Sequence, residues 1–362
     1  MFHNSMKKIL FSATTLVAVI SLVLAGCGDD NDSEGASSTE KPLIVVTTNI
    51  LGDVVTNMVG DSFDVETIMP PGSDPHDFQA SAQQVQTMMS ADLLIVNGAN
   101  FEEGMLDVIE NAESDGVMIF EAISVVSQLE GSDDHGHDDH DDHEGHDDHD
   151  DHEGHNDHDD HEGHDDHEGH DDHEGHEGHE GHNHGGIDPH FFTDPARMAV
   201  VAQELSEFLV ANFPDADQGF VSTANDYVKQ LQALDSEVEE TLSAISSGER
   251  LLVTNHAVFA YFADRYSFTV LGEIIPSSST LASASAQQLA SLAEEIKENQ
   301  VKAIFADASS SDALAQTLAD EVSGVEVINL YTESLGDPGS AGESYIDMIR
   351  FNAEAIASAL VG

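Results

Sequence analysis

Short apolar runs alternate with amphipathic stretches in the first ordered part of the chain, from about residue 43. The expected strands are 43–48, 64–69, 93–96 and 117–120, and the expected helices are 50–59, 81–90 and 102–110. The helices have apolar residues at spacings of three and four, and the strands are short runs closed by turn residues such as Asn97-Gly98. Strands that alternate with helices in this way are typical of a parallel sheet covered by helices.

The same alternation returns after a long amphipathic stretch over 216–246, which follows an expected helix at 195–212. A helix of that length would extend about 45 Å, enough to bridge two domains. The strands expected after it are 251–254, 268–273, 301–306 and 325–330, and the helices are 258–266, 286–299, 312–322 and 343–360. We therefore predict an α/β protein of two lobes, each with a parallel sheet flanked by helices, joined by a long rigid helix.

The N-terminal segment has the features of a targeting signal. Lys7 and Lys8 precede an apolar run over 9–24, and the following Leu-Ala-Gly-Cys resembles a bacterial lipobox that ends at Cys27. This resemblance implies cleavage before Cys27 and acylation of that residue. The alternative is an uncleaved anchor, although the run is shorter than the roughly 20 residues of a membrane span. Either way we expect an extracytoplasmic protein anchored to a bacterial membrane, at the cell surface or in the periplasm.

These patterns divide the 362 residues into five parts. They are a signal peptide with lipobox at 1–27, a flexible tether at 28–41, an N-terminal α/β lobe at 42–213, a linking helix at 214–248 and a C-terminal α/β lobe at 249–362. Residues 133–184 of the N-terminal lobe contain almost only His, Asp, Glu and Gly, so we expect a disordered loop there.

The charge of the chain is strongly negative. Its 71 acidic and 10 basic residues give a formal charge of −61, which excludes nucleic acid as a partner because phosphates would be repelled. Such a charge attracts cations, although an acidic surface also serves solubility alone. Cys27 is the only cysteine, so neither an intrachain disulfide nor a cysteine-based zinc site is available.

The loop at 133–184 holds 18 of the 22 histidines. We interpret it as a weak, multi-site collector or sensor of metal ions, because neutral imidazole is a good ligand and the interleaved carboxylates concentrate cations. The alternative is repeat expansion in a tolerant surface loop. The candidate weak ligands are His135, His137, His140, His143, His146, His149, His152, His155, His158, His161, His164, His167, His170, His173, His176, His179, His182 and His184.

Three histidines outside this loop and the signal occupy similar places in the pattern. His76 follows the second strand, His190 precedes a helix, and His256 follows the first strand of the second lobe. A single loop histidine is commonly incidental. Because ligands of open α/β sheets bind at the carboxyl ends of strands, however, the three are expected to meet in one crevice. Three imidazoles suit zinc.

The motifs around these histidines resemble those of cluster A-I metal-binding solute-binding proteins, which serve ABC importers for zinc and manganese. The matching segments, in family order, are PHDFQ, DPHFFTDP, TNHAVFAYFADRY and LYTESLG. The resemblance covers nearly the whole chain after the tether and includes the long central helix. It also includes the acidic His-rich insertion, which is typical of zinc members such as the high-affinity zinc uptake periplasmic protein.

This resemblance implies that His76, His190 and His256 are metal ligands and that Glu333 occupies the position of the family's carboxylate. The family usually has Asp at that position, so Glu333, Asp307 and a water molecule all remain candidates for the fourth ligand. The family also usually has Trp in its second motif, where this chain has two phenylalanines.

The expected cargo is Zn²⁺. The resemblance implies this because zinc members carry His at the position of His256, where manganese members tend to carry a carboxylate. Mn²⁺ and Fe²⁺ are the alternatives. The implied partners are an ABC permease and its ATPase subunit, and we expect a monomer without enzymatic activity. Two other functions remain open. Zinc hydrolases also use three histidines with an open position, and a surface protein could buffer metal or mediate adhesion without a transporter.

Overall fold

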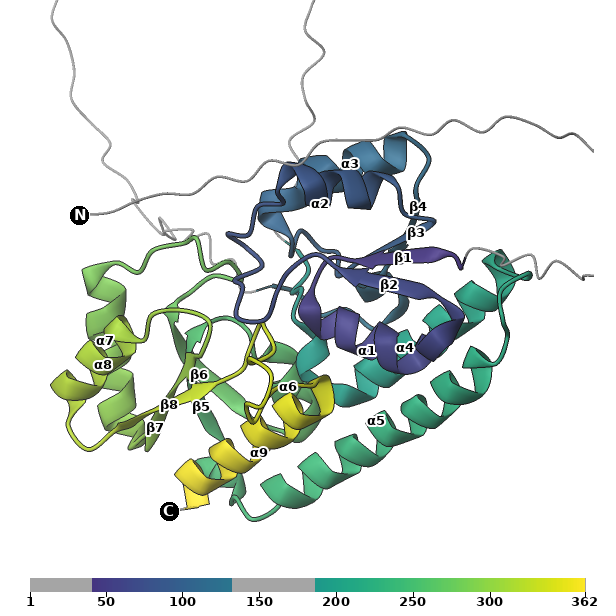
Figure 1. Cartoon of the computed structure of the whole chain (residues 1–362). Helices are drawn as coiled ribbons and strands as arrows, with labels where there is room; N and C mark the ends of the chain where they lie inside the picture. The colour runs from purple at the N-terminus through teal and green to yellow at the C-terminus, as the bar shows by residue number, and fades with distance from the viewer. Residues whose placement is uncertain (1–40, 132–185, 362) are drawn as a thin grey trace, which may run out of the picture. The chain divides into compact units, whose positions relative to one another are not determined.

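Two four-stranded parallel sheets lie in the residues that the computed structural model describes, 41–131 and 186–361 (Figure 1). The first sheet has the order β2-β1-β3-β4 and the second the order β6-β5-β7-β8. Their strands are β1 Leu43–Val46, β2 Asp64–Thr67, β3 Leu93–Val96, β4 Met118–Glu121, β5 Leu251–His256, β6 Thr269–Ile275, β7 Ala303–Asp307 and β8 Glu326–Leu330. The predicted α/β class with two parallel sheets is therefore confirmed. The expected signal peptide, tether and His-rich loop lie outside the described residues.

Three of the four helices of the first lobe, α1, α2 and α4, begin where the sequence supplies a capping side chain. They are α1 Asn49–Val59, α2 Ala82–Met89, α3 Leu106–Ser114 and α4 Pro195–Asn212. Ser81 and Gln84 form a capping box on α2, and Asp194 accepts two backbone N–H groups at the start of α4. The helix expected at 102–110 differs, because a 3-10 turn over Glu103–Met105 comes first and α3 continues to Ser114.

The linking helix, α5 Phe220–Leu242, is shorter than the expected range of 216–246. Its 23 residues extend about 35 Å. It ends at Leu242 because the chain turns there, and the Arg250 guanidinium donates to the backbone carbonyls of Leu242, Ile245 and Tyr266. It packs against α1, α4 and α9 and so connects the lobes (Figure 1). The helices after it are α6 Ala260–Tyr266, α7 Ala286–Asn299, α8 Ala313–Val322 and α9 Tyr345–Val361.

One hydrophobic core runs through both lobes. It takes Ile44 from the first sheet, Leu231 and Leu234 from α5, Leu252 from the second sheet and Ile356 from α9, all of them 2% exposed or less. Each sheet also buries its other face, one against α2 and α3 and the other against α7 and α8. The central strands β1, β3, β5 and β7 are buried almost throughout. Strands buried on both faces are nearly continuous apolar runs, which is why the sequence pattern located these four well.

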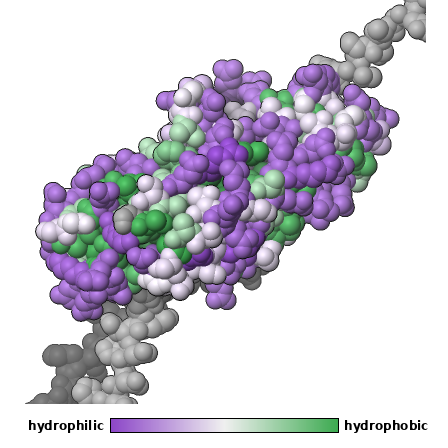
Figure 2. Space-filling view, turned by 90° about the horizontal axis from the view of Figure 1, so that it is seen from below, coloured by the Kyte–Doolittle hydropathy of each residue, from purple (hydrophilic) through white to green (hydrophobic). Residues whose placement is uncertain are grey.

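The surface is mostly polar. Figure 2 shows one face of the molecule, on which hydrophilic residues predominate and hydrophobic residues form small patches. In the ranges 41–131 and 186–361, no helix combines the length and the apolar character needed to cross a membrane.

Candidate metal centre

The structure brings His76, His190, His256 and Glu333 together in one buried cluster. Each offers one ligand atom, and these four atoms lie within 4.8 Å of one another. His76 lies in the loop after β2, His256 is the last residue of β5, and Glu333 follows β8. The carboxyl ends of strands from both sheets therefore supply the cluster, as expected for open parallel sheets. No residue of the four is more than 2% exposed.

A single oxygen of Glu333 lies at the centre of the cluster. Its Oε1 is 2.8 Å from Nε2 of His76, 3.2 Å from Nε2 of His190 and 3.0 Å from Nε2 of His256. Ligands of a tetrahedral zinc ion at about 2.05 Å lie about 3.3 Å apart, and the three distances from Oε1 to the Nε2 atoms are close to that value. Glu333 Oε2 is buried and has no hydrogen-bond partner among the described residues, and His256 Nε2 has none of good geometry there, although Oε1 lies 3.0 Å away.

Two of the imidazoles are oriented by carboxylates on their far side. His190 Nδ1 lies 2.8 Å from Oδ1 of Asp188, and His76 Nδ1 lies 2.9 Å from Oε1 of Glu103. Because a carboxylate only accepts hydrogen bonds, both Nδ1 atoms carry the proton, and in the neutral ring the Nε2 lone pair faces the cluster. This carboxylate–histidine arrangement fixes the ring and strengthens it as a metal ligand. His256 Nδ1 has no such partner in the described parts of the chain.

The cluster is electrostatically prepared for a cation. Burial alone would lower the pKa of His76, but its bonds to Glu103 and Glu333 outweigh burial and raise that pKa to about 10. The pKa of His190 is raised against the same effect of burial, chiefly by Asp188. Burial would raise the pKa of Glu333, yet the three histidines hold it well below its usual range. Positive charge is thus favoured here, as bound protons or as a metal ion.

Two identical triplets hold the first two histidines. Asp74-Pro75-His76 and Asp188-Pro189-His190 each fold so that Oδ1 of the aspartate accepts the backbone N–H of the histidine, at 2.9 and 2.8 Å. The repeated Asp-Pro-His pattern was visible in the sequence and could have identified Asp188 as a positioning residue.

Glu103 had no comparable sequence signal, because its position depends on the packing of two loops. A Cβ on Gly104 would collide with the carbonyl oxygen of Phe78, so the glycine lets the Glu103 turn approach the His76 loop closely.

Aromatic rings exclude water on one side of the cluster. The Phe101 ring packs edge-on against His76 and His190, with centroid distances of 5.1 and 5.5 Å, and Phe192 lies 5.9 Å from His190. Phe192, one of the two phenylalanines of the second motif, also packs against Phe101, with a centroid distance of 5.3 Å. Phe101 follows a backbone turn in which Gly98, Ala99 and Asn100 all have positive φ, at 89°, 51° and 59°. Two non-glycine residues in this region indicate backbone strain beside the site.

Asp307, the other candidate for the fourth ligand, is not part of the cluster. Its Oδ1 accepts the backbone N–H of Ser309 at 2.8 Å, and its Oδ2 accepts the Ser309 hydroxyl at 2.7 Å. Burial, together with the nearby charge of Glu333, raises the pKa of Asp307 to about 6. Asp307 caps the turn after β7. It does so while buried, with 2% of the residue exposed.

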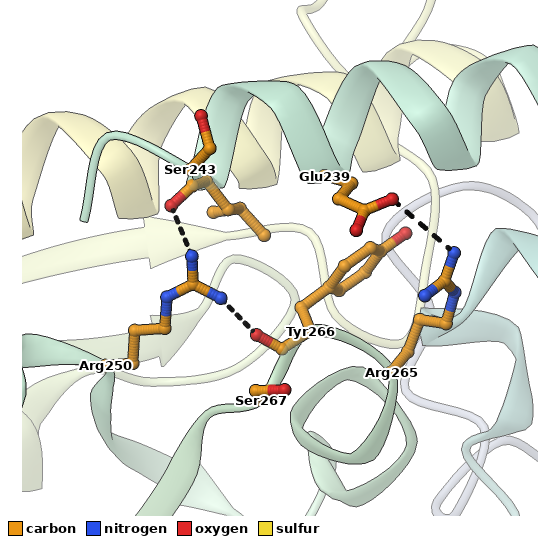
Figure 3. Close-up of a pocket in the computed structure, with 7 residues that line it drawn as sticks. Glu239, Ser243, Arg250, Arg265, Tyr266 and Ser267 are labelled. Carbon is orange, nitrogen blue, oxygen red and sulfur yellow. Dashed lines mark hydrogen bonds and ion pairs between the residues drawn. The ribbon is translucent and has the colours of Figure 1, made fainter. Parts of the chain in front are cut away.

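A separate cavity of about 150 Å³ lies where α5 ends (Figure 3). Arg250 and Arg265 line it, but both guanidinium groups are engaged. Arg250 donates to three backbone carbonyls, and Arg265 bonds to Asp235 at 2.9 and 2.5 Å. We interpret these contacts as stabilising the end of α5.

The chain is similar over most of its length to known metal-transport proteins. A family model described as "Zinc-uptake complex component A periplasmic" matches residues 44–359. The manganese ABC transporter substrate-binding lipoprotein PsaA of Streptococcus anginosus is 24% identical over 363 residues, covering 98% of this chain and 99% of that protein. The manganese-binding lipoprotein MntA of Halalkalibacterium halodurans is 26% identical over 357 residues, with the same coverage.

Solved structures share the fold. The periplasmic zinc binding protein TroA from Treponema pallidum matches with a TM-score of 0.68 and 23% identity, over 88% of this chain and 99% of that one. A Mn-bound periplasmic metal binding protein from Candidatus Liberibacter asiaticus matches with a TM-score of 0.67 and 18% identity, over 88% of this chain and all of that one.

Proposed function

Because the chain belongs to the family of metal-binding solute-binding proteins of ABC importers, matched over residues 44–359, we propose that it captures a divalent transition metal ion outside the cytoplasm and delivers it to a membrane permease. The family is one of binding proteins rather than enzymes, in agreement with the sequence-based expectation. The ion is the cargo, and its ligands are His76, His190, His256 and Glu333.

The observation that carries this proposal is the convergence of three Nε2 atoms on one carboxylate oxygen in a buried cluster. Buried polar atoms without partners are costly, and a cation would satisfy both Glu333 Oε2 and His256 Nε2. It would also replace the protons that the raised pKa values of His76 and His190 hold in the cluster.

We further propose that the cargo is zinc, with manganese as the alternative. Three imidazoles and one carboxylate are a nitrogen-rich set that suits zinc, whereas manganese prefers oxygen ligands. The family description names zinc uptake, and the Treponema protein is described as zinc binding. The Streptococcus and Halalkalibacterium relatives are described as manganese proteins. Because the similar proteins are divided between the two metals, the proposal of zinc rests on the donor set of this chain.

Delivery requires the protein to remain near its permease. We propose that acylation of Cys27 anchors the chain outside the cytoplasm, where it works with an ABC permease and an ATPase. The described relatives include substrate-binding lipoproteins of ABC transporters, which supports this arrangement.

A competition titration against a chelator tests the ligand set. His190→Ala and His256→Ala each remove a nitrogen donor, and we expect zinc affinity to fall by orders of magnitude. His146→Ala, a matched change in the His-rich loop, should leave the tight site unchanged. Glu333→Ala should cost less than either histidine change if water enters the vacated position. Wild-type affinity in His190→Ala or His256→Ala would refute the proposed site.

A further inference from the structure

The loop between β6 and α7, residues 276–285, contains no buried residue although it lies beside a fully buried cluster. Its sequence, PSSSTLASAS, has a single large apolar side chain, and that side chain, Leu281, is 56% exposed. A segment with few buried apolar contacts opens at low free-energy cost. This loop is therefore suited to move while the sheets on either side stay folded.

The Thr280 side chain ties this loop to the other lobe. The Thr280 hydroxyl donates to Oδ2 of Asp74 at 2.8 Å. The other oxygen of the same carboxylate, Oδ1, accepts the backbone N–H of His76 at 2.9 Å. At its start the loop is fixed beside another cluster residue, because the N–H of Ala257, which follows His256, donates to the carbonyl of Ser277 at 3.0 Å. The loop thus spans from His256 to His76.

The loop also covers the side of the cluster that is nearest to solvent. Among the carboxylates that contact the histidine rings, Glu333 and Asp188 have side chains 0% and 3% exposed, whereas that of Glu103 is 32% exposed. Burial raises the pKa of Glu103, but hydrogen bonds from His76 and from the Ser279 hydroxyl outweigh it and keep that pKa low. Ser279 therefore lies against the most exposed carboxylate of the site.

We propose that residues 276–285 form a lid, that the Thr280 hydroxyl latches it to Asp74, and that opening this latch is the step that lets a metal ion enter or leave. This inference rests on the proposed function. The ion is enclosed by ligands that are at most 2% exposed, so exchange requires a displacement. Lifting the lid uncovers Glu103 and, behind it, His76, without disturbing either hydrophobic sheet face. Thr280 is then a positioning residue that controls rates, not a ligand.

Stopped-flow kinetics of the full-length protein test the lid, with Zn²⁺ as the probe and excess chromogenic chelator to report release. Thr280→Val removes the hydroxyl but keeps the shape of the side chain. We expect release about tenfold faster, the value of one hydroxyl–carboxylate hydrogen bond, and capture faster by a similar factor, so that the dissociation constant changes little. Thr280→Ser should restore the wild-type rates, and Ser283→Ala, an exposed change in the same loop, should not alter them.

Two results would overturn the lid. The first is a release rate in Thr280→Val equal to that of wild type. The second is weaker affinity with unchanged capture, which would mean that Thr280 only supports Asp74 and the binding geometry. Failure of the proposed function itself would look different, because wild-type protein and all variants would then lack the tight zinc site in an equilibrium titration and show only the weak class of the His-rich loop.

Discussion

Replacing Asp188 with Asn tests whether the carboxylates behind the histidines strengthen metal binding. Oδ1 of Asp188 accepts both the N–H and the Nδ1–H of His190, each at 2.8 Å. An Asn side-chain oxygen can accept the same two bonds, so the ring should stay in place while the negative charge is lost. Partners of this kind contribute 10- to 100-fold to metal affinity, which corresponds to about 1.4 to 2.7 kcal/mol.

The matched change Glu103→Gln should have a smaller effect. The contact of Glu103 with His76 is almost as short, 2.9 Å, but its side chain is 32% exposed against 3% for Asp188. Solvent therefore screens its charge more strongly. We expect a loss near 100-fold for Asp188→Asn and of tenfold or less for Glu103→Gln. Asp226→Asn, on the exposed surface of α5, should have none.

Chelator competition at constant pH and ionic strength measures these affinities, and circular dichroism checks that each variant is folded. The reasoning is refuted if Asp188→Asn binds within threefold of wild type. Equal losses in Asp188→Asn and Glu103→Gln would show that burial does not set the strength of these contacts.

Three further predictions concern pH, the His-rich loop and the anchor. The pKa of His76 is raised from 6.5 to about 10 in the metal-free protein. The contribution of protonated His76 to folding stability is therefore complete below pH 6.5 and is lost as pH rises through about 10. The free energy of unfolding, measured in urea, should fall over this pH range, and it should fall less in His76→Gln. Calorimetry of a variant that lacks 133–184 should still show one tight zinc site but no weak zinc sites. In the full-length protein the weak sites should fade below pH about 6.5, where the imidazoles become protonated. Loss of the tight site in the deletion variant would contradict this prediction. Cys27→Ala should abolish lipid labelling, and unchanged labelling would exclude the lipobox.

The sequence predicted the fold well because the central strands of both sheets are buried on both faces. Continuous apolar runs such as that of β3 leave little choice of secondary structure, and α7 was located at its observed bounds, helped by the Ser285 cap. The ends of α5 were less predictable. Its apolar spacing continues past Leu242, and the turn that stops it depends on Arg250, which reaches back from the start of β5 to bond the helix carbonyls.

The candidate site was predictable only in part. Three histidines and Glu333 carry motifs, and the structure brings all four together. The residues behind them were missed for two different reasons. Asp188 is two residues from His190 and could have been found from the repeated Asp-Pro-His triplet. Glu103 is 27 residues from His76, and its contact arises only when the two loops pack, which no local pattern reports.

The hydrophobic core that runs through both lobes means that neither half of this protein is an independent folding unit. Cutting the chain before α5 would leave Ile44 and its neighbours in one fragment, and Leu231, Leu252 and Ile356 in the other, each facing water. Because exposing apolar surface on that scale is costly, we expect a single cooperative unfolding transition for the two lobes. The two sheets cannot then be exchanged singly between homologues; a functional chimera would have to carry the core and both sheets together.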